Sequence, residues 1–114
     1  MHEYSLVMSL VQRVEEEARA RRAVAVHAVK VSVGELAGVE PELFRTAYET
    51  FREGTVCERA ALEISTWPAS WSCPGCGRSF APGEVLRCGA CDRPAKADAR
   101  SEALLLDAID MEVP

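Results

Sequence analysis

Four cysteines in two pairs constrain this chain more than any other feature. Cys73-Pro74-Gly75-Cys76 and Cys88-Gly89-Ala90-Cys91 each place two residues between their cysteines. A turn of that spacing aims both thiolates at one ion, and two such turns supply the tetrahedral shell that zinc favours. Because protein atoms fill all four positions, such a site is closed and therefore structural. We predict a structural zinc site whose ligands are Cys73, Cys76, Cys88 and Cys91.

The segment that carries these pairs, residues 70–100, is too short to fold on a core of its own, so bound metal would supply its stability. Between the pairs, residues 79–81 and 85–87 flank Pro82-Gly83, a pattern that predicts a short hairpin. The glycines beside the cysteines are expected to permit tight turns, including a positive φ; they are Gly75, Gly77 and Gly89.

Two other roles for the cysteines fit less well. A dithiol redox centre places one Cys-x-x-Cys at the start of a helix, and neither pair opens a segment with helical periodicity. A zinc ribbon that reads nucleic acid is normally basic. Residues 71–100 hold five basic and three acidic side chains, an excess that four zinc-bound thiolates would cancel. We therefore expect no nucleic-acid partner.

The rest of the chain predicts two helices. One has an apolar stripe and is expected to end near Ala23; the stripe is Leu6, Val7, Leu10, Val11, Val14 and Ala18. The other begins at Pro41, which suits a first helical turn, and stops at Gly54. Its predicted apolar stripe is Leu43, Phe44, Ala47, Tyr48 and Phe51.

Three segments predict strands: residues 24–33, 61–67 and 104–113. In the first, the valines change parity around His27, which requires a bulge or burial of both faces. In the last, Ile109, Met111 and Val113 alternate with acidic residues. The order helix–strand–helix–strand–strand indicates an α+β fold. We expect one domain from residues 1–69 plus 101–114 and an inserted zinc domain at 70–100.

Composition narrows the function classes. The net charge of −5 gives no reason to expect affinity for a polyanion such as DNA. No apolar run is long enough for a membrane helix, and the start of the chain does not resemble a signal peptide, so we expect a cytoplasmic protein. We find no nucleophile–base pairing and no phosphate loop, and so expect no enzyme. Cys57 and His27 are interpreted as a buried apolar residue and an ordinary strand residue.

The first three residues, Met1-His2-Glu3, offer nitrogen donors for Ni²⁺. The terminal amine, the His2 amide and the His2 imidazole could form fused chelate rings, and the Glu3 amide could complete a planar set. Copper would accept the same donors. A histidine at position 2 is also common as a plain surface residue, so these residues alone leave both interpretations open.

Three stretches resemble one known family. They are Met1-His2-Glu3-Tyr4-Ser5-Leu6, the segment Val33-Gly34-Glu35-Leu36-Ala37-Gly38-Val39-Glu40-Pro41-Glu42, and the two cysteine pairs, in this order. Together they are similar to the HypA/HybF family of hydrogenase maturation nickel metallochaperones, over essentially the whole chain. The second pair departs from the commoner Cys-Pro-x-Cys, and no histidine flanks either pair.

The resemblance implies two helices packed on a three-stranded sheet, with a protruding zinc domain. It implies Ni(II) as cargo, bound by His2 with the Met1 amine and the backbone nitrogens of His2 and Glu3, and with Glu40 close by. It assigns zinc to the four paired cysteines. The implied partners are the maturation GTPase HypB and the large subunit of [NiFe]-hydrogenase, and in some relatives urease maturation proteins.

One alternative remains beside the nickel chaperone. The chain could be an adaptor whose zinc ribbon only holds a protein partner and which carries no nickel of its own. The two hypotheses differ at His2, whose replacement would be silent in an adaptor.

Overall fold

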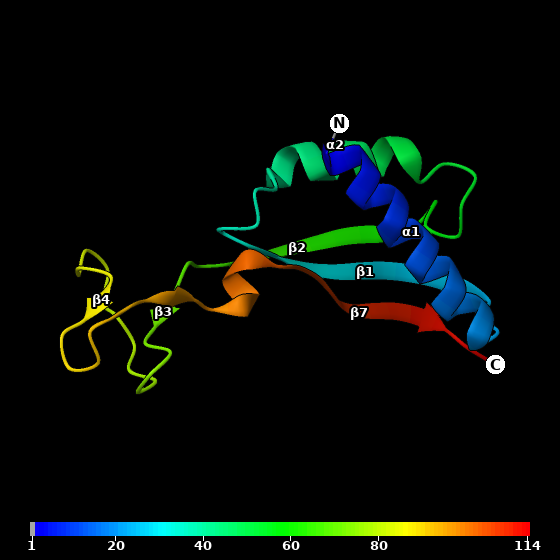
Figure 1. Cartoon of the computed structure of the whole chain (residues 1–114). Coiled ribbons are helices and arrows are strands. Elements are labelled where there is room, and N and C mark those ends of the chain that lie inside the picture. The colour runs from blue at the N-terminus through cyan, green and yellow to red at the C-terminus, as the bar shows by residue number, and fades with distance from the viewer. Residues whose placement is uncertain (1) are drawn as a thin grey trace.

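The computed structural model describes residues 2–114, with only the backbone of His2. Helix α1 (His2–Ala20) is followed by strand β1 (Ala25–Gly34), helix α2 (Pro41–Phe51), strand β2 (Ala61–Trp67) and, after the cysteine-bearing segment, strand β7 (Leu104–Glu112). The three long strands form one sheet in the order β2-β1-β7, and both helices lie on the same face of it (Figure 1). The predicted α+β fold and element order are confirmed.

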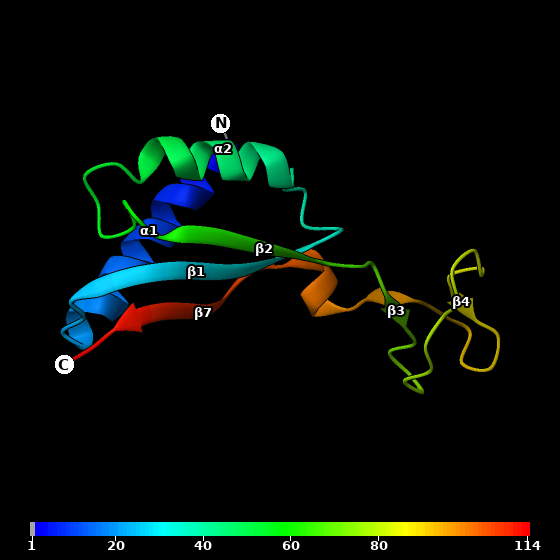
Figure 2. The same ribbon diagram turned by 180° about the vertical axis from the view of Figure 1, so that it is seen from behind.

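The sheet is mixed. Strand β2 runs parallel to β1, with Val29 opposite Leu62, whereas β7 runs antiparallel to β1, with Val29 opposite Ile109. Parallel neighbours need a crossover connection, and α2 provides it between β1 and β2. This crossover returns the chain at Trp67 to the end of the sheet from which β1 leaves at Gly34. The cysteine-bearing segment starts from that end (Figure 2).

A bulge in β1 explains why the buried valines change from even to odd positions around His27. The pairing with β7 shifts between Val26 and Ala28, which leaves His27 out of the ladder. Because one residue is skipped, Val26 and Val29 are both buried although their spacing is odd. The His27 side chain stays exposed, with its Nε2 atom 3.2 Å from a Glu112 carboxylate oxygen.

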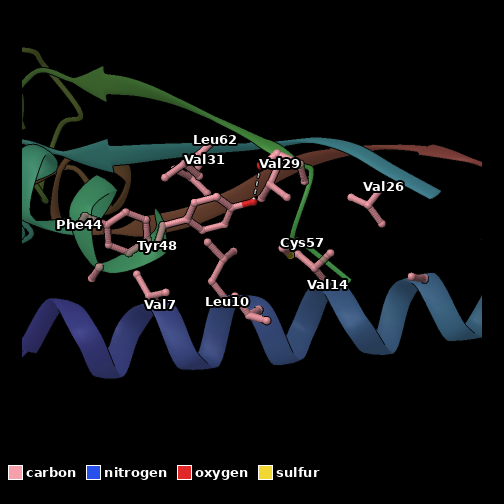
Figure 3. Packing of buried hydrophobic residues seen from close by; sticks show 14 residues of the cluster. Val7, Leu10, Val14, Val26, Val29, Val31, Phe44, Tyr48, Cys57 and Leu62 are labelled. Carbon is pink, nitrogen blue, oxygen red and sulfur yellow. Dashed lines mark hydrogen bonds between the residues drawn. The ribbon is translucent and has the colours of Figure 1, made fainter. Parts of the chain in front are cut away.

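The core lies between α1, α2 and the sheet (Figure 3). Five members of the predicted α1 stripe are buried: Val7, Leu10, Val11, Val14 and Ala18. The helix ends at Ala20 rather than near Ala23. Arg22 adopts φ 54° and the Ala23 N–H donates to the Ala18 carbonyl at 2.9 Å. This is a Schellman cap without the usual glycine, so no stop residue marked it in the sequence.

Helix α2 contributes Phe44, Ala47 and Tyr48 to the core. The Tyr48 hydroxyl donates to the Ala60 carbonyl at 2.8 Å (Figure 3), and burial, the largest cause, raises the Tyr48 pKa. Cys57 is fully buried, as expected for an apolar residue. Two predicted core residues, Leu43 and Val113, are each 50% exposed. Leu43 lies at the edge of the helix stripe, and Val113 lies beyond the end of β7.

We call residues 71–97 the cysteine lobe. Its neck pairs β3 (Trp71–Ser72) with β6 (Lys96–Ala97), and its tip pairs β4 (Arg87–Cys88) with β5 (Arg93–Pro94). The 3₁₀ helix η1 (Ala99–Glu102) leads back to β7. The predicted hairpin around Pro82-Gly83 is wrong. Ser79 forms a β-bridge with Ser72 instead, across the first cysteine turn. Strand β4 pairs with β5 across the second cysteine turn. The cysteine turns, rather than the turn at Pro82-Gly83, therefore reverse the paired segments.

The lobe protrudes from one end of the sheet, which makes the molecule 55 Å long and only 17 Å in its shortest dimension (Figures 1 and 2). No helix in residues 2–114 combines the length and apolarity needed to cross a membrane.

Candidate metal centres

The cysteine lobe brings four thiols to one point. The sulfurs of Cys73, Cys76, Cys88 and Cys91 all lie within 4.8 Å of one another, and the Cys76 and Cys88 sulfurs are 3.9 Å apart. A tetrahedral zinc site with Zn–S bonds of about 2.3 Å has sulfur–sulfur edges of about 3.8 Å. The four thiols therefore fit a tetrahedral divalent ion with soft ligands, as the spacing in the sequence predicts.

The two Cys-x-x-Cys turns are built in the same way. The Gly77 N–H donates to the Cys73 carbonyl, and the Asp92 N–H donates to the Cys88 carbonyl, both at 2.8 Å. The donor residue in each turn has a positive φ, 78° at Gly77 and 52° at Asp92. Of the three glycines expected to need this conformation, only Gly77 uses it. Asp92 fills the equivalent position in the second turn, because aspartate tolerates the left-handed region better than most residues do.

Gly75 serves a different purpose. A Cβ atom at this position would lie 3.1 Å from the Cys91 sulfur and 3.3 Å from its Cβ. The absence of a side chain at Gly75 lets the first turn pack directly against the second pair. This close approach is what brings sulfurs from turns far apart in the sequence into one cluster.

Nearby donors prepare two of the thiols for metal binding. The backbone N–H of Cys91, followed by the Arg78 guanidinium, lowers the pKa of Cys88 to about 6. The backbone N–H of Cys76 is the main cause of the lowered pKa of Cys73. The sulfurs of Cys73 and Cys76 raise the pKa of Cys91 to about 12, because a third thiolate beside them is unfavourable without a cation. Metal binding at this cluster would therefore release protons.

The spacing of the cysteines did not predict a role for Arg78 beside the four thiols. The Arg78 guanidinium lies 4.0 Å from the centre of the Phe80 ring and donates to Glu84 at 2.8 Å. These contacts hold a positive charge beside the Cys88 sulfur, whose pKa it helps to lower. The position of Arg78 two residues after the first cysteine pair is the only signal of this role in the sequence.

The second group of predicted ligands lies where the two helices begin. Glu3 is in the first turn of α1, and Glu40 precedes the first turn of α2. A Glu3 carboxylate oxygen accepts a hydrogen bond from the Glu40 N–H at 3.3 Å. Residues 37 positions apart in the sequence thus meet here. The other two predicted ligands, Met1 and the side chain of His2, lie outside the described residues.

Glu40 is also the N-cap of α2. One of its carboxylate oxygens accepts hydrogen bonds from the backbone N–H groups of Glu42 and Leu43 at 3.0 and 3.1 Å. Pro41, at the first helical position, has no N–H to satisfy. The carboxylate of Glu40 is therefore held in place by the helix that it starts.

Comparison with known proteins points to one family. A sequence model of the family described as hydrogenase/urease nickel incorporation metallochaperone, HypA, matches residues 1–111. The hydrogenase maturation factor HypA of Wolinella succinogenes is 35% identical over 114 residues, covering 98% of this chain and 96% of that protein. The HypA of Aquifex aeolicus is 36% identical, covering 99% of both.

Solved structures lead to the same family. The solution structure of the nickel metallochaperone HypA from Helicobacter pylori matches with a TM-score of 0.75 and 30% identity, over 98% of both chains. A second solution structure of a HypA protein matches with a TM-score of 0.80 and 32% identity, over 97% of this chain and 96% of that one. The chain therefore belongs to the HypA family of metallochaperones for nickel incorporation into hydrogenase and urease.

Proposed function

We propose that this protein binds Ni(II) at its N-terminus and delivers it to the large subunit of [NiFe]-hydrogenase during maturation. The ligands in this proposal are the Met1 amine, the His2 imidazole and the backbone nitrogens of His2 and Glu3, with the carboxylates of Glu3 and Glu40 beside them. The observation that carries it is the hydrogen bond from the Glu40 backbone N–H to the Glu3 carboxylate, which brings a second acidic residue to the start of α1.

The start of a helix suits a chelate made from backbone nitrogen. The first backbone N–H groups of α1 have no acceptor within the helix, so their deprotonation breaks no helical hydrogen bond. The positive end of the helix dipole also favours the anionic form of these amides. The carboxylates of Glu3 and Glu40 supply the negative charge that attracts the cation. The amides and carboxylates thus have complementary roles in capturing Ni²⁺.

In this proposal the metal at the cysteine cluster is zinc and its role is structural. Protein sulfurs supply the whole tetrahedral set, so substrate has no position on the ion. We also propose that residues 70–100 form a zinc domain distinct from the nickel-binding domain of residues 1–69 and 101–114. The support is that the short strands of the lobe form two sheets of their own, β3 with β6 and β4 with β5, and none joins the three-stranded sheet.

The partners in the proposal follow from the family. We infer that the GTPase HypB works with this protein and that the hydrogenase large subunit receives the metal. Urease maturation proteins are further recipients to test, since the family description includes urease. We also propose that this activity takes place in the cytoplasm.

The decisive experiment is a calorimetric titration of Ni²⁺ into zinc-loaded protein whose first residue is Met1. The matched sample is His2→Gln, which removes the imidazole and keeps the side-chain length. We expect one nickel per chain in the first sample and loss of that binding in the second. Equal binding by both samples would contradict the ligand role of His2, and absence of binding in both would favour the adaptor, whose function needs no nickel.

A further inference from the structure

Two stretches of chain connect the cysteine lobe to the sheet, one after β2 and one through η1 into β7. The segment of residues 34–40, which begins at the last residue of β1, contacts both of them. On the first connection, a Glu35 carboxylate oxygen accepts a hydrogen bond from the Ala69 N–H at 2.7 Å. The Glu35 N–H donates to the Trp67 carbonyl at 2.8 Å. Glu35 thus holds the chain as it leaves β2 for the lobe.

On the second connection the contacts are made by backbone. The Leu36 N–H donates to the Ser101 carbonyl and the Gly34 N–H donates to the Ala103 carbonyl, both at 2.8 Å. A Cβ atom at Gly34 would lie 2.3 Å from the Ser101 carbonyl oxygen. Gly34 therefore lets η1 approach β1 more closely than any other residue would.

Arg100, in η1, reaches the open face of the sheet. Its guanidinium carbon lies 4.1 Å from the centre of the Trp67 ring, and the guanidinium donates to Ser32 and Asp107 at 3.4 and 3.5 Å. Asp107 sits where β7 skips a residue in its pairing with β1. Ser32, which alternation predicts to be solvent-facing, is 1% exposed beneath these groups. Arg100 thus joins all three strands of the sheet to the returning connection.

The neck of the lobe is braced separately. The Asp98 carboxylate accepts hydrogen bonds from the hydroxyls of Ser70 and Ser72, the latter at 3.1 Å. This brace ties the two connections to each other. It does not set the angle between the connections and the sheet, which depends on other contacts. Glu35 holds the first connection at Ala69 and Arg100 holds the second at η1. A rotation of the lobe that carries these two connections with it therefore breaks the side-chain contacts of Glu35 and Arg100.

The other end of the same segment meets the start of α1. Glu40, five residues after Glu35, donates its backbone N–H to the Glu3 carboxylate. One segment of the chain thus touches both the proposed nickel-binding end and the base of the cysteine lobe. Because this segment is short, the distance from the start of α1 to the cysteine lobe depends on how the base of the lobe is held against the sheet.

We propose that Glu35 and Arg100 are positioning residues that hold the cysteine lobe in one orientation relative to the start of α1. Neither is a metal ligand. The consequence for delivery, that a partner seated on the lobe finds the nickel site at a set distance, rests on the function proposed above. The orientation itself does not depend on nickel.

Residual dipolar couplings of the full, zinc-loaded chain test this orientation, because they report whether two parts of a molecule share one alignment. We expect amides of the lobe and of the sheet to fit a single alignment tensor in the unchanged protein. In the protein that carries both Glu35→Ala and Arg100→Ala, we expect the lobe and the sheet to need separate tensors, with weaker alignment of the lobe than of the sheet. Glu35→Gln keeps a carbonyl acceptor for the Ala69 N–H and should restore the shared tensor when Arg100 is present. Glu58→Ala, on an exposed residue before β2, is the control.

Two results would overturn the proposal. One is a shared tensor in the doubly substituted protein whose amide spectrum shows that it is folded. The other is separate tensors in the unchanged protein. Nickel titration of the same samples keeps the two proposals distinguishable. We expect the affinity of the substituted proteins to match that of the unchanged one, whereas absence of nickel binding in the unchanged protein would overturn the proposed function and leave the orientation result standing.

Discussion

At the scale of single residues, Glu40 combines two tasks at one position. Its carboxylate caps α2 through the N–H groups of Glu42 and Leu43, and its own N–H binds Glu3. The first task needs only an oxygen acceptor, whereas attraction of a cation needs the negative charge. Two substitutions can therefore separate the tasks.

Glu40→Gln keeps an acceptor oxygen and removes the charge, so we expect little change in the free energy of unfolding. Loss of one charge near the bound cation should weaken nickel binding by about 1 kcal/mol, or roughly fivefold in Kd. Glu40→Ala removes the cap as well and should cost about 1 kcal/mol of stability. Calorimetry and denaturant unfolding measure the two effects. Unchanged nickel affinity in Glu40→Gln would exclude a role for the charge.

The left-handed residues of the two cysteine turns allow a matched comparison. Gly77→Ala places a Cβ at φ 78°, which costs about 1–2 kcal/mol and should weaken zinc binding about tenfold. Asp92→Gly relieves the same strain in the second turn. It loses only an exposed ion pair with Arg87, which contributes little, so zinc binding should strengthen. Competition with a chromophoric chelator measures both. The same change in both variants would contradict the equivalence of the turns.

At the scale of elements, α2 connects the parallel strands and also fastens the loop before β2. Tyr48 carries out the second task, since its buried ring ends in a hydroxyl that donates to Ala60. Arg52 donates to the same carbonyl at 3.1 Å. The carbonyl therefore keeps one partner if the Tyr48 hydroxyl is removed.

Tyr48→Phe should thus cost only about 1 kcal/mol of unfolding free energy, near the typical net value of one hydrogen bond. Tyr48→Ala also removes the buried ring and should cost about 3–5 kcal/mol. Urea denaturation followed by circular dichroism measures both values. A loss in Tyr48→Phe as large as that in Tyr48→Ala would show that the Ala60 carbonyl is not compensated by Arg52.

At the scale of the whole molecule, the two proposed metal sites lie in parts with different sources of stability. The helices and the sheet share an apolar core, whereas the lobe has only two-residue strands and four sulfurs around one point. We therefore expect metal binding to stabilise the lobe and to be unnecessary for the core.

Cys73→Ser should abolish zinc binding and the amide dispersion of residues 71–97, while the sheet signals and nickel binding persist. Cys57→Ala is the control, because it removes a cysteine from the core and leaves the four clustered thiols in place. Metal analysis and heteronuclear spectra report the outcome. Loss of nickel binding in a Cys73→Ser protein with an intact sheet would show that the two sites are more tightly coupled than we propose.

Much of the fold follows from local patterns in the sequence. The α1 stripe and the alternation in β2 identify buried residues directly, because each depends only on the period of its own element. Where burial depends on a distant segment, such patterns fail. Ser32 is buried because Arg100 and Asp107 cover it, and Leu43 is 50% exposed although the period of α2 predicts burial.

The sequence by itself determined the two candidate donor sets. The spacing of the cysteines specifies a group of four sulfurs, and the nitrogens of the first three residues are adjacent in the covalent chain. Both donor sets can therefore be predicted without knowledge of the tertiary structure. Only the tertiary structure decided what surrounds them. The meeting of Glu3 with Glu40, the approach of Gly75 to Cys91 and the anchoring of the lobe by Glu35 all join residues far apart in the chain. Tertiary packing, within the lobe for Gly75 and between distant segments for the other two contacts, brings those residues together, and no local period does.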